Sequence, residues 1–389
     1  MWPVAVARVY CQQQKLAMAL TTISDRVPPT VDVFRHPDEF PADVAAFFAA
    51  AEMDNFEFGA DWYRNFVDHV DGVAGQARFF VLRQGNAVTA ALPLLQQRGS
   101  FPLRRELKSL ANYYTALYSP LLSATSSADE LALLLKSALR LAGSPDSLTF
   151  RPLDPQAPAY QLLLQALRLA GLPAYEFFCF GNWYEPVRQT WPAYLAERDG
   201  KIRSTIKRMG KKFAAEGGEL TILTDAGDIE RMLDDYQSVY GASWKQAEPH
   251  VNFIPGLISL CARKGWLRMG VARLQGRAIG AQLWMVAQGK VEIYKLAYDE
   301  AYKGYSPGTL LTQLLMQHVF EHDAAVEIDY LIGDDDYKRG WMSQRRERWG
   351  IIAFNPRTLG GLAGLAREAL GRMARRFKTQ RSSAAATTL

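Results

Sequence analysis

The segment 329–341, DYLIGDDDYKRGW, concentrates side chains that can move protons. It combines four aspartates with two tyrosines, a lysine and a tryptophan. An aspartate can accept a proton from an attacking nucleophile, and a tyrosine can donate one to a leaving group. Three interpretations are open from the string alone: a metal site, a solvated acidic turn whose side chains cap nearby backbone groups, or one wall of an active site.

A second segment, YKGYSPGTLLTQLL at 302–315, has the composition of an anion-binding turn. A strand is expected to end near Tyr298 and a helix to open at Thr309. The first N–H groups of a helix lack backbone partners and carry partial positive charge, so they can hold a phosphate group. Gly304 and Gly308 would let the backbone approach a pyrophosphate closely, and Lys303 would supply charge. The simpler alternative is an ordinary loop capped by Ser306.

The order of elements around these segments predicts a mixed sheet. Hydrophobic periodicity and turn residues predict a strand at 219–224, helices at 228–244 and 254–263, strands at 267–274, 278–287 and 290–298, a helix at 309–323 and a strand at 326–332. An antiparallel meander followed by one helix and a further strand implies a mixed sheet with helices on its faces.

The chain also repeats itself. QGNAVTAALPLL at 84–95 matches QGRAIGAQLWMV at 275–286, and YSP at 118–120 recurs at 305–307. A predicted helix and then a strand follow YSP in both places, at 128–142 and 147–150 in the first copy. Matches in the same order at nearly the same offset predict a duplicated domain.

Composition narrows the class of protein. The chain has 389 residues, 49% of them hydrophobic, and a net charge of +5, which predicts two globular domains rather than a disordered chain. No apolar run reaches the roughly 20 residues that a membrane span needs. Cys11, Cys179 and Cys261 are far apart, which argues against a disulfide framework or a cysteine zinc site and favours a reducing, cytoplasmic compartment. Basic residues crowd 201–212 and 345–381 and suit anionic partners.

The predicted order of meander, glycine loop, helix and strand is that of the GNAT acyltransferases. The stretch 267–341 resembles the GNAT-type acetyltransferase domain of CelD-like cellulose-biosynthesis proteins, a group related to the Fem peptidyltransferases, which carry two tandem GNAT-like folds. The resemblance rests on GRAIGAQL, YDEAYKGYSPGTLL and DYLIGDDDYKRGW. The positions that match the family's ending are Asp329, Gly333, Asp334, Tyr337, Lys338 and Trp341, and Trp244 matches an earlier tryptophan.

The resemblance implies a fold class and a division of the chain. The fold is α/β (α+β), with two tandem GNAT-like (acyl-CoA N-acyltransferase) folds, each a mixed, mostly antiparallel sheet flanked by helices. The expected parts are a poorly ordered extension at 1–29, a degenerate domain at 30–185, a basic linking helix within 186–218, the acetyltransferase domain at 219–358 and a basic amphipathic tail at 359–389. Because recognisable structure begins only near Val31, Met18 is an alternative start.

The resemblance also implies a site. Acetyl-CoA or another acyl-CoA would lie on the loop and the end of the preceding strand, at Leu296, Ala297, Lys303, Gly304, Ser306, Gly308 and Thr309. A backbone N–H near 295–297 would stabilise the oxyanion. Asp329 or Asp334 would act as base, and Tyr337 would assist as proton donor. The acceptor would meet Trp244, Lys338 and Trp341. In the first copy Leu121-Leu122 replaces Gly-Thr, so that copy is expected to shape the acceptor cleft instead.

The function that follows is acyl transfer, most simply N-acetylation, to an amine or hydroxyl of a small molecule or glycan, in surface polysaccharide or cell-envelope biosynthesis. No metal and no specific nucleic acid are expected. One alternative is a Fem-type aminoacyl-tRNA-dependent transferase, which the basic helix within 191–218 favours. The other is a non-catalytic scaffold in polysaccharide assembly. The basic tail would lie on the inner membrane or on a partner, or it would dock on the protein as a C-terminal helix.

Two metal patterns are set aside. HVFEH at 318–322 has the H-x-x-E-H spacing of some zinc proteases. On a helical wheel, however, His318 and His322 fall on the apolar arc with Leu311, Leu314, Leu315 and Val319, which predicts packed core histidines. The three consecutive aspartates at 334–336 offer too few oxygen ligands for a divalent metal by themselves.

Overall fold

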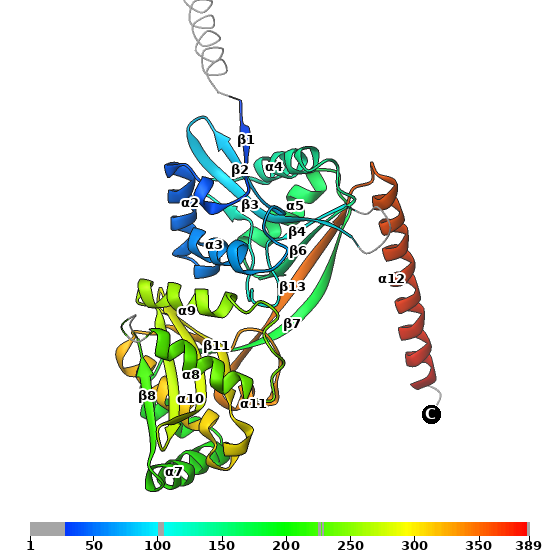
Figure 1. The fold of residues 1–389 in the computed structure, drawn as a ribbon. Helices are drawn as coiled ribbons and strands as arrows, with labels where there is room; N and C mark the ends of the chain where they lie inside the picture. Colours follow the sequence, from blue (N-terminus) through cyan, green and yellow to red (C-terminus); the bar gives the residue numbers. More distant parts are fainter. Residues whose placement is uncertain (1–27, 100–104, 225–226, 228, 387–389) are drawn as a thin grey trace, which may run out of the picture.

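The computed structural model describes residues 28–99, 105–224, 227 and 229–386, with side chains described as far as Met373. Its organising feature is one continuous sheet that runs through both halves of the chain (Figure 1). The strand order is β1-β2-β3-β4-β6-β13-β7-β12-β11-β10-β9-β8, with β5 beside β3.

The first half supplies the strands at one end of this sheet. They are β1 (Thr30–Phe34), β2 (Ala77–Gln84), β3 (Ala87–Arg98), β4 (Arg105–Ser109), β5 (Leu121–Leu122), β6 (Ser147–Leu153) and β7 (Ala174–Pro186). Its helices are α2 (Ala42–Glu52), α3 (Ala60–His69), α4 (Ala128–Leu141) and α5 (Pro158–Leu169), with the 3₁₀ turns η1 (Pro37–Glu39) and η2 (Phe56–Phe58). Ser127 and Glu130 cap α4 reciprocally, as a capping box.

The second half supplies the other end. Its strands are β8 (Gly218–Leu223), β9 (Leu267–Leu274), β10 (Arg277–Ala287), β11 (Lys290–Tyr298), β12 (Glu327–Asp329) and β13 (Gln344–Phe354). Its helices are α6 (Trp191–Glu197), α7 (Gly200–Ala215), α8 (Ile229–Gly241), α9 (Phe253–Lys264), α10 (Pro307–His322) and α11 (Asp336–Trp341), with the 3₁₀ helix η4 (Glu300–Tyr305) before α10.

The strand order is symmetric about its centre. Reading inward from the two ends, β1, β2, β3, β4 and β6 correspond to β8, β9, β10, β11 and β12. Pairing is parallel at the same place in both halves, between β4 and β6 and between β11 and β12. The predicted duplication and the two tandem GNAT-like folds are therefore confirmed. The antiparallel meanders close through the tight turns at 85–86 and 275–276, where the sequence repeat begins.

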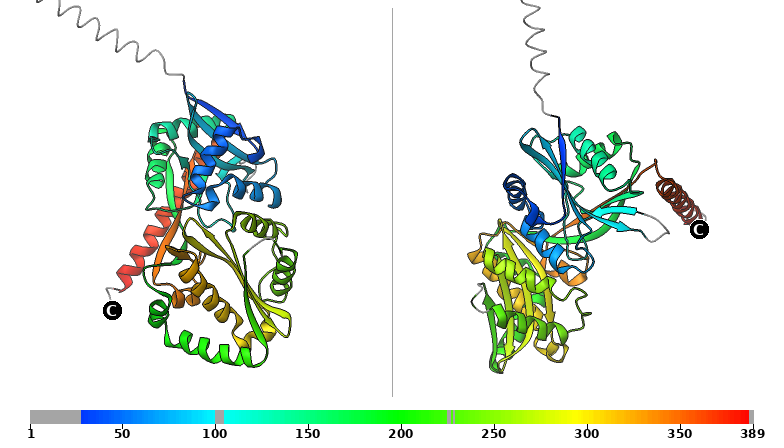
Figure 2. Two further views of the ribbon diagram at one scale, coloured as in Figure 1. Left: turned by 90° about the vertical axis from the view of Figure 1, so that its left-hand side faces the viewer. Right: turned by 45° about the horizontal axis from the view of Figure 1, so that its top comes forward.

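The two halves exchange their last strands, which the repeat did not predict. β13 lies between β6 and β7, so the C-terminal strand completes the sheet of the first half. β7 in turn pairs with β12 of the second half. Figures 1 and 2 show these two long strands crossing from one half to the other. The predicted division into 30–185 and 219–358 stays a prediction, because each half of the sheet contains a strand from the other range.

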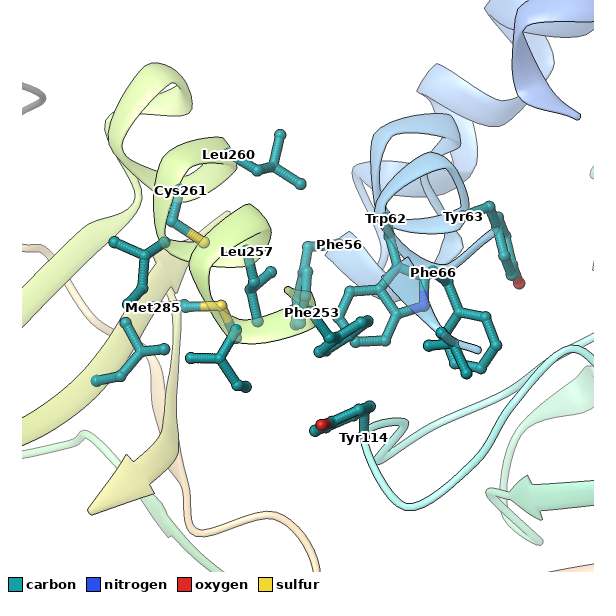
Figure 3. Packing of buried hydrophobic residues seen from close by; sticks show 14 of the residues in the cluster. Phe56, Trp62, Tyr63, Phe66, Tyr114, Phe253, Leu257, Leu260, Cys261 and Met285 are labelled. Carbon is teal, nitrogen blue, oxygen red and sulfur yellow. The ribbon is translucent and has the colours of Figure 1, made fainter. Parts of the chain in front are cut away.

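A hydrophobic core joins the halves. Helices α2 and α3 pack with α8 and α9 on the same face of the sheet, and their buried side chains form a single cluster. Figure 3 shows its aromatic centre, where Trp62 and Phe66 of α3 meet Phe253 of α9 and Tyr114. The Tyr114 and Phe253 rings are stacked, with centroids 3.9 Å apart. Burial of large aromatic rings is among the strongest contributions to packing, so the halves form one unit.

Two predicted elements differ from the structure. The basic linking helix is two helices, α6 and α7, because the chain is extended at Arg198. Asp199 then caps α7 by accepting a hydrogen bond from the Lys201 N–H.

The strand expected at 326–332 ends at Asp329. There the Asp329 carboxylate accepts a hydrogen bond from the Leu331 N–H, 2.6 Å away, and Leu331 takes a left-handed conformation.

The C-terminal helix α12 (Leu359–Ala386) leaves the end of β13 and stands beside the body of the molecule (Figure 1). Arg372 anchors it by lying over the Tyr175 ring and donating to the Glu176 carbonyl. Leu359, Leu370 and Met373 are exposed along it. Within the described residues, no helix is both long and apolar enough to cross a membrane. Membrane contact through this tail stays a prediction, and residues 1–27 of the expected N-terminal extension lie outside the described residues.

Candidate active site

The central feature of the site is an opening between two parallel strands. β11 pairs with β12 only from Lys290 opposite Glu327 to Glu292 opposite Asp329. β11 then continues to Tyr298, whereas the chain after β12 turns away at Leu331. The sheet therefore opens along the second half of β11. Two cavities are lined by residues of this part of β11.

A β-bulge re-aims side chains where the opening begins. The register of β11 against β10 shifts between Leu283 and Trp284, so Tyr294 is an extra residue without a partner in the ladder. Its hydroxyl donates to the Tyr114 carbonyl at 2.8 Å and ties β11 to a loop of the first half. Bulges of this kind commonly redirect side chains next to functional sites.

The first cavity, of about 310 Å³, lies beside the N-terminus of α10. We call it the α10 cavity; its lining includes Gln282, Leu296, Ala297, Tyr298, Gly308 and Thr309. The start of α10 lies close to β10, because a Cβ on Gly280 would come within 3.2 Å of Pro307. Gln282 fixes this start, since its amide donates to the Gly308 carbonyl at 2.9 Å and to the Thr312 hydroxyl at 3.0 Å.

The structure brings together part of the predicted cofactor loop. Leu296, Ala297, Gly308 and Thr309 line the α10 cavity. Lys303, Gly304 and Ser306 precede the helix, in η4 and at its N-cap, and are not part of that lining. Ser306 does not cap α10 through its side chain; it adopts a left-handed conformation, and Pro307 begins the helix. Ser306 is therefore the N-cap residue of α10 through its backbone alone, and it forms a left-handed corner before Pro307.

The second cavity, of about 200 Å³, lies between the end of β11 and the first half. We call it the lysine cavity, because Lys245, Lys295 and Lys338 line it. Tyr113 and Tyr114 of the first half form one wall, and Asp335 is the one carboxylate among the described residues of its lining. The first copy thus contributes directly to a cavity beside the opened strand.

Two of the three lysines are already paired. Lys295 donates to Glu248 at 2.6 Å. Burial alone would raise the pKa of Glu248, but the hydrogen bonds from Lys295 and Tyr114 outweigh burial and lower it. Lys338 is buried and donates to the Ile332 carbonyl at 2.5 Å, with Asp335 3.4 Å away. Burial lowers the pKa of Lys338, and the neighbouring aspartates oppose that shift.

Lys245 differs from both. Among the described residues, no carboxylate or carbonyl forms an ion pair or hydrogen bond with its ammonium group, which lies about 6 Å from the centroids of the Trp244 and Tyr240 rings. Burial and the nearby charge of Lys295 lower its pKa to about 8. It is therefore a partly desolvated cation that faces a cavity without a partner of its own.

The α10 cavity and the lysine cavity share a boundary, because Leu296, Tyr330 and Tyr337 line both. The alternation of hydrogen-bonded pairs along β11 sets the direction of its N–H groups. The Asp299 N–H donates to the Ile279 carbonyl on the β10 side. Because every second N–H group of a strand points the same way, the N–H groups of Ala297 and Lys295 also point toward β10. The Leu296 N–H points the other way, toward the opening. A backbone donor therefore points to where the cavities meet.

The aspartates predicted as bases lie outside both linings. Asp329 is buried and forms an ion pair with Arg346 and a hydrogen bond with Asn182. Asp334 is on the surface, where hydrogen bonds from Arg345 and the Trp183 indole lower its pKa. Their catalytic roles stay predictions, and the geometry directs attention to Asp335 instead.

The remaining predicted residues lie at the cavities. Tyr337 lines both, and burial together with Asp335 raises the pKa of its phenol, so it stays protonated at neutral pH. Lys338 lines the lysine cavity. Trp244 and Trp341 line the α10 cavity, where the Trp244 ring packs on Tyr298 with centroids 4.6 Å apart.

Sequence reasoning missed several residues that the fold brings to the cavities: Tyr113, Tyr114, Lys245, Gln282 and Tyr330. The repeat held a signal for Gln282, because the first copy has Ala91 at the matching position. No comparable signal marked Tyr113 or Tyr114, which reach the site from the other half.

The metal patterns find no support. Among the described residues, no group of three or more histidines, cysteines or acidic residues is placed to hold a metal ion. The prediction that His318 and His322 are core residues is wrong: His322 is exposed and His318 is partly exposed. The two rings pack on each other at the end of α10, and His318 lies 3.7 Å from Asp323.

A strand order with one parallel pair, present in both halves of the chain, and an opening beside a helix N-terminus in the second half define a tandem GNAT-like fold. Residues 200–339 match the family model described as an acetyltransferase (GNAT) domain. This match covers β9 to β12 and the whole opening. No curated protein sequence matches the chain, and membership of the CelD-like group stays a prediction.

Solved structures share the fold at low identity. The crystal structure of FemX matches with a TM-score of 0.52 and 12% identity over 71% of this chain and 87% of that one. The C-terminal domain of a putative lysylphosphatidylglycerol synthetase from Agrobacterium fabrum matches at 0.51 and 14%, over 85% and 97%. A tandem GNAT protein from the clavulanic acid biosynthesis pathway matches at 0.50 and 14%, over 85% and 100%. At these identities the likeness concerns the fold alone.

Proposed function

We propose that the protein is an acyl-CoA-dependent acyltransferase that acylates an amine or hydroxyl of a small acceptor. One observation carries the proposal: two cavities meet at the opened strand β11 and share Leu296, Tyr330 and Tyr337. The donor would enter through the α10 cavity and the acceptor through the lysine cavity. Both would then reach the same point without a covalent enzyme intermediate.

The α10 cavity has features that fit an acyl-CoA. Its walls combine apolar side chains with the first turn of α10, whose N–H groups suit an anion. A bound acyl-CoA would supply an activated thioester. The acceptor nitrogen or oxygen forms a bond to the carbonyl carbon, the carbon–sulfur bond breaks, and the sulfur leaves as thiolate. The Leu296 N–H is placed to stabilise the negative charge that develops on the carbonyl oxygen.

Two side chains suit the proton transfers. Asp335 is the carboxylate in the lysine cavity, where it can take the acceptor's proton directly or through water. Tyr337 lies at the shared boundary, where its hydroxyl can give a proton to the departing thiolate. These assignments keep the predicted role of Tyr337 and move the base from Asp329 or Asp334 to Asp335.

The proposal is tested by titrating the purified protein with acetyl-CoA in a calorimeter. We expect one binding site, lost in Gly308→Asp, because a carboxylate at the first turn of α10 would repel an anionic ligand and contact Tyr298, 3.5 Å from a Cβ at that position. The matched control is Leu133→Asp on the exposed face of α4. Unchanged binding in Gly308→Asp would reject the donor site.

The base assignment is tested separately. Acceptor screening with amino sugars, amino acids and polyamines, read as CoA release, comes first. Asp335→Asn is then compared with Asp334→Asn. We expect kcat to fall about a hundredfold in the first and to stay near wild type in the second. Equal losses in both variants would reject Asp335.

A second candidate function is transfer of an aminoacyl group from charged tRNA. Two observations favour it: the fold similarity to FemX, and the exposure of Lys201, Arg203, Lys207, Arg208, Lys211 and Lys212 along α7. Exposed basic stripes attract nucleic acid without specificity, however, so the stripe decides little alone. Transfer from aminoacyl-tRNA without added CoA, together with absence of acetyl-CoA binding, would establish this function instead.

A further inference from the structure

The lysine cavity has an excess of positive charge that its own carboxylates do not balance. Lys295 is matched by Glu248, and Lys338 by Asp335 and three backbone carbonyls. Lys245 is left over. The charges that face it are Lys295, Lys338, Glu248 and Asp335, two of each sign, so the cluster with Lys245 carries one net positive charge.

An ammonium group in this position is costly without a partner. Removing a charge from water is unfavourable unless another charge or hydrogen bond compensates, and Lys245 is largely enclosed. The Trp244 and Tyr240 rings offset part of that cost as cation–π partners at about 6 Å. A ligand anion would provide the missing partner, and the space for it is the cavity itself.

We propose, on the basis of the proposed acyltransferase function, that the acceptor carries an anionic group, a carboxylate or a phosphate, that binds Lys245 in the lysine cavity. The cavity, of about 200 Å³, has room for an amino acid or for the anionic end of a sugar phosphate. Binding of the anion at Lys245 directs the acceptor's nucleophile toward the boundary at Leu296 and Tyr337.

The lining excludes the opposite charge. A polyamine would bring further positive charge next to Lys245 and Lys295, and like charges at close range repel strongly in an enclosed site. Asp335 is exposed and already lies near Lys338, so it leaves little attraction for a second cation. The acceptor's amine is therefore expected to react as the neutral base beside a fixed anion.

The kinetic test uses matched acceptor pairs with acetyl-CoA and CoA release as the readout. Glycine is compared with glycinamide, and glucosamine 6-phosphate with glucosamine, so the pairs also separate carboxylate from phosphate. We expect one anionic member to be preferred. Lys245→Gln should raise its KM by roughly tenfold to a hundredfold with little change in kcat, and Lys245→Arg should restore most of the affinity.

The matched control is Lys136→Gln, an exposed lysine of α4 outside the cavity lining, which should leave both members of each pair unchanged. Equal use of the neutral and anionic members, or an equal KM effect of Lys245→Gln on both, would overturn the proposal. So would preference for a polyamine in the acceptor screen.

A binding test keeps the proposal testable if the proposed function fails. The protein is acetylated with limiting acetic anhydride at pH 7.5, with and without millimolar inorganic phosphate or acetate, and labelling of Lys245 and Lys136 is quantified by mass spectrometry. Selective protection of Lys245 supports the anion site even if acetyl-CoA does not bind. Equal labelling of Lys245 with and without both anions would overturn the anion site while leaving the acyltransferase proposal to its own test.

Discussion

The two halves of the molecule have the same strand order but carry different residues on the matching strands β3 and β10. Strand β10 carries Gly280, Gln282 and Trp284, where the matching residues of β3 are Thr89, Ala91 and Pro93. Gly280 allows close approach of α10, and Gln282 bonds to its first turn while accepting a hydrogen bond from the Trp284 indole. The first half lacks all three features.

The segment after YSP differs accordingly. In the second half, Pro307 and Gly308 begin α10 at once. In the first half, Leu121 and Leu122 pair with β3 as the short strand β5, and α4 begins only at Ala128. The helix N-terminus that could hold an anion therefore begins eight residues after the matching proline, Pro120, in the first half.

The loop that precedes YSP in the first half contributes to the lysine cavity. After β4 the loop 110–118 reaches across to the second half and places Tyr113 and Tyr114 in the lysine cavity. The buried carboxylate of Glu57 holds this loop by accepting hydrogen bonds from the Ala116 and Leu117 N–H groups at 2.8 and 2.7 Å. One half has a helix N-terminus beside its meander, and the other supplies a wall of the neighbouring cavity.

The largest expected effect tests the opened strand of the second half. Leu296→Pro removes the N–H that faces the opening without breaking a bond to β10, so the fold should persist while kcat falls by about 10²–10³-fold. The measurement is steady-state kinetics together with circular dichroism. Leu296→Ala keeps the N–H and should lose much less. Similar losses in the two variants would assign the effect to the side chain.

A smaller effect is expected when Gly280 is replaced by threonine, the residue at the matching position of the first half. Gly280→Thr places a side chain against Pro307 and Leu311, 3.2 and 3.3 Å from the new Cβ, and should displace the start of α10. We expect a loss of roughly 1–3 kcal/mol in the free energy of unfolding and at least a tenfold rise in the Kd for acetyl-CoA. Thermal unfolding and calorimetry measure the two quantities.

The reciprocal variant, Thr89→Gly, is the control for Gly280→Thr. It should lower stability modestly and leave acetyl-CoA affinity unchanged, because the first half has no helix N-terminus beside that strand. A comparable loss of affinity in both variants would mean that the two halves are not functionally distinct at this position.

The smallest effect concerns the lysine cavity, which residues of both halves line. Because the pKa of Lys245 is about 8, its charge is present below that pH and lost above it. The Ki of an amine-free acid analogue of the preferred acceptor should therefore be flat to pH 7 and rise toward tenfold per pH unit above 8. Lys245→Arg should keep the Ki constant through this range. A rise of equal size in that variant would assign the titration to another group.

Local pattern predicted most of the second half correctly. β9 and β11 have the expected bounds, and β10, α9 and α10 differ by only a few residues, because tight turns and apolar periodicity are local properties. The position of Gly308 and Thr309 at the start of a helix was visible for the same reason, and their contact with a cofactor stays a prediction. Asp329 and Asp334 attracted attention through their spacing, but spacing does not show that Arg346 and Arg345 approach them from β13.

The sequence by itself determined the duplication, the GNAT-like order of elements and the turn at the start of α10, since each depends on residues near one another in the chain. Only the tertiary structure decided how the halves share strands and which residues face the opening. Tyr114 meets Lys295 and Phe253 across more than a hundred positions, with the Lys295 ammonium 5.1 Å from its ring centroid. Such contacts depend on packing between distant segments, which leaves no periodic trace in either segment.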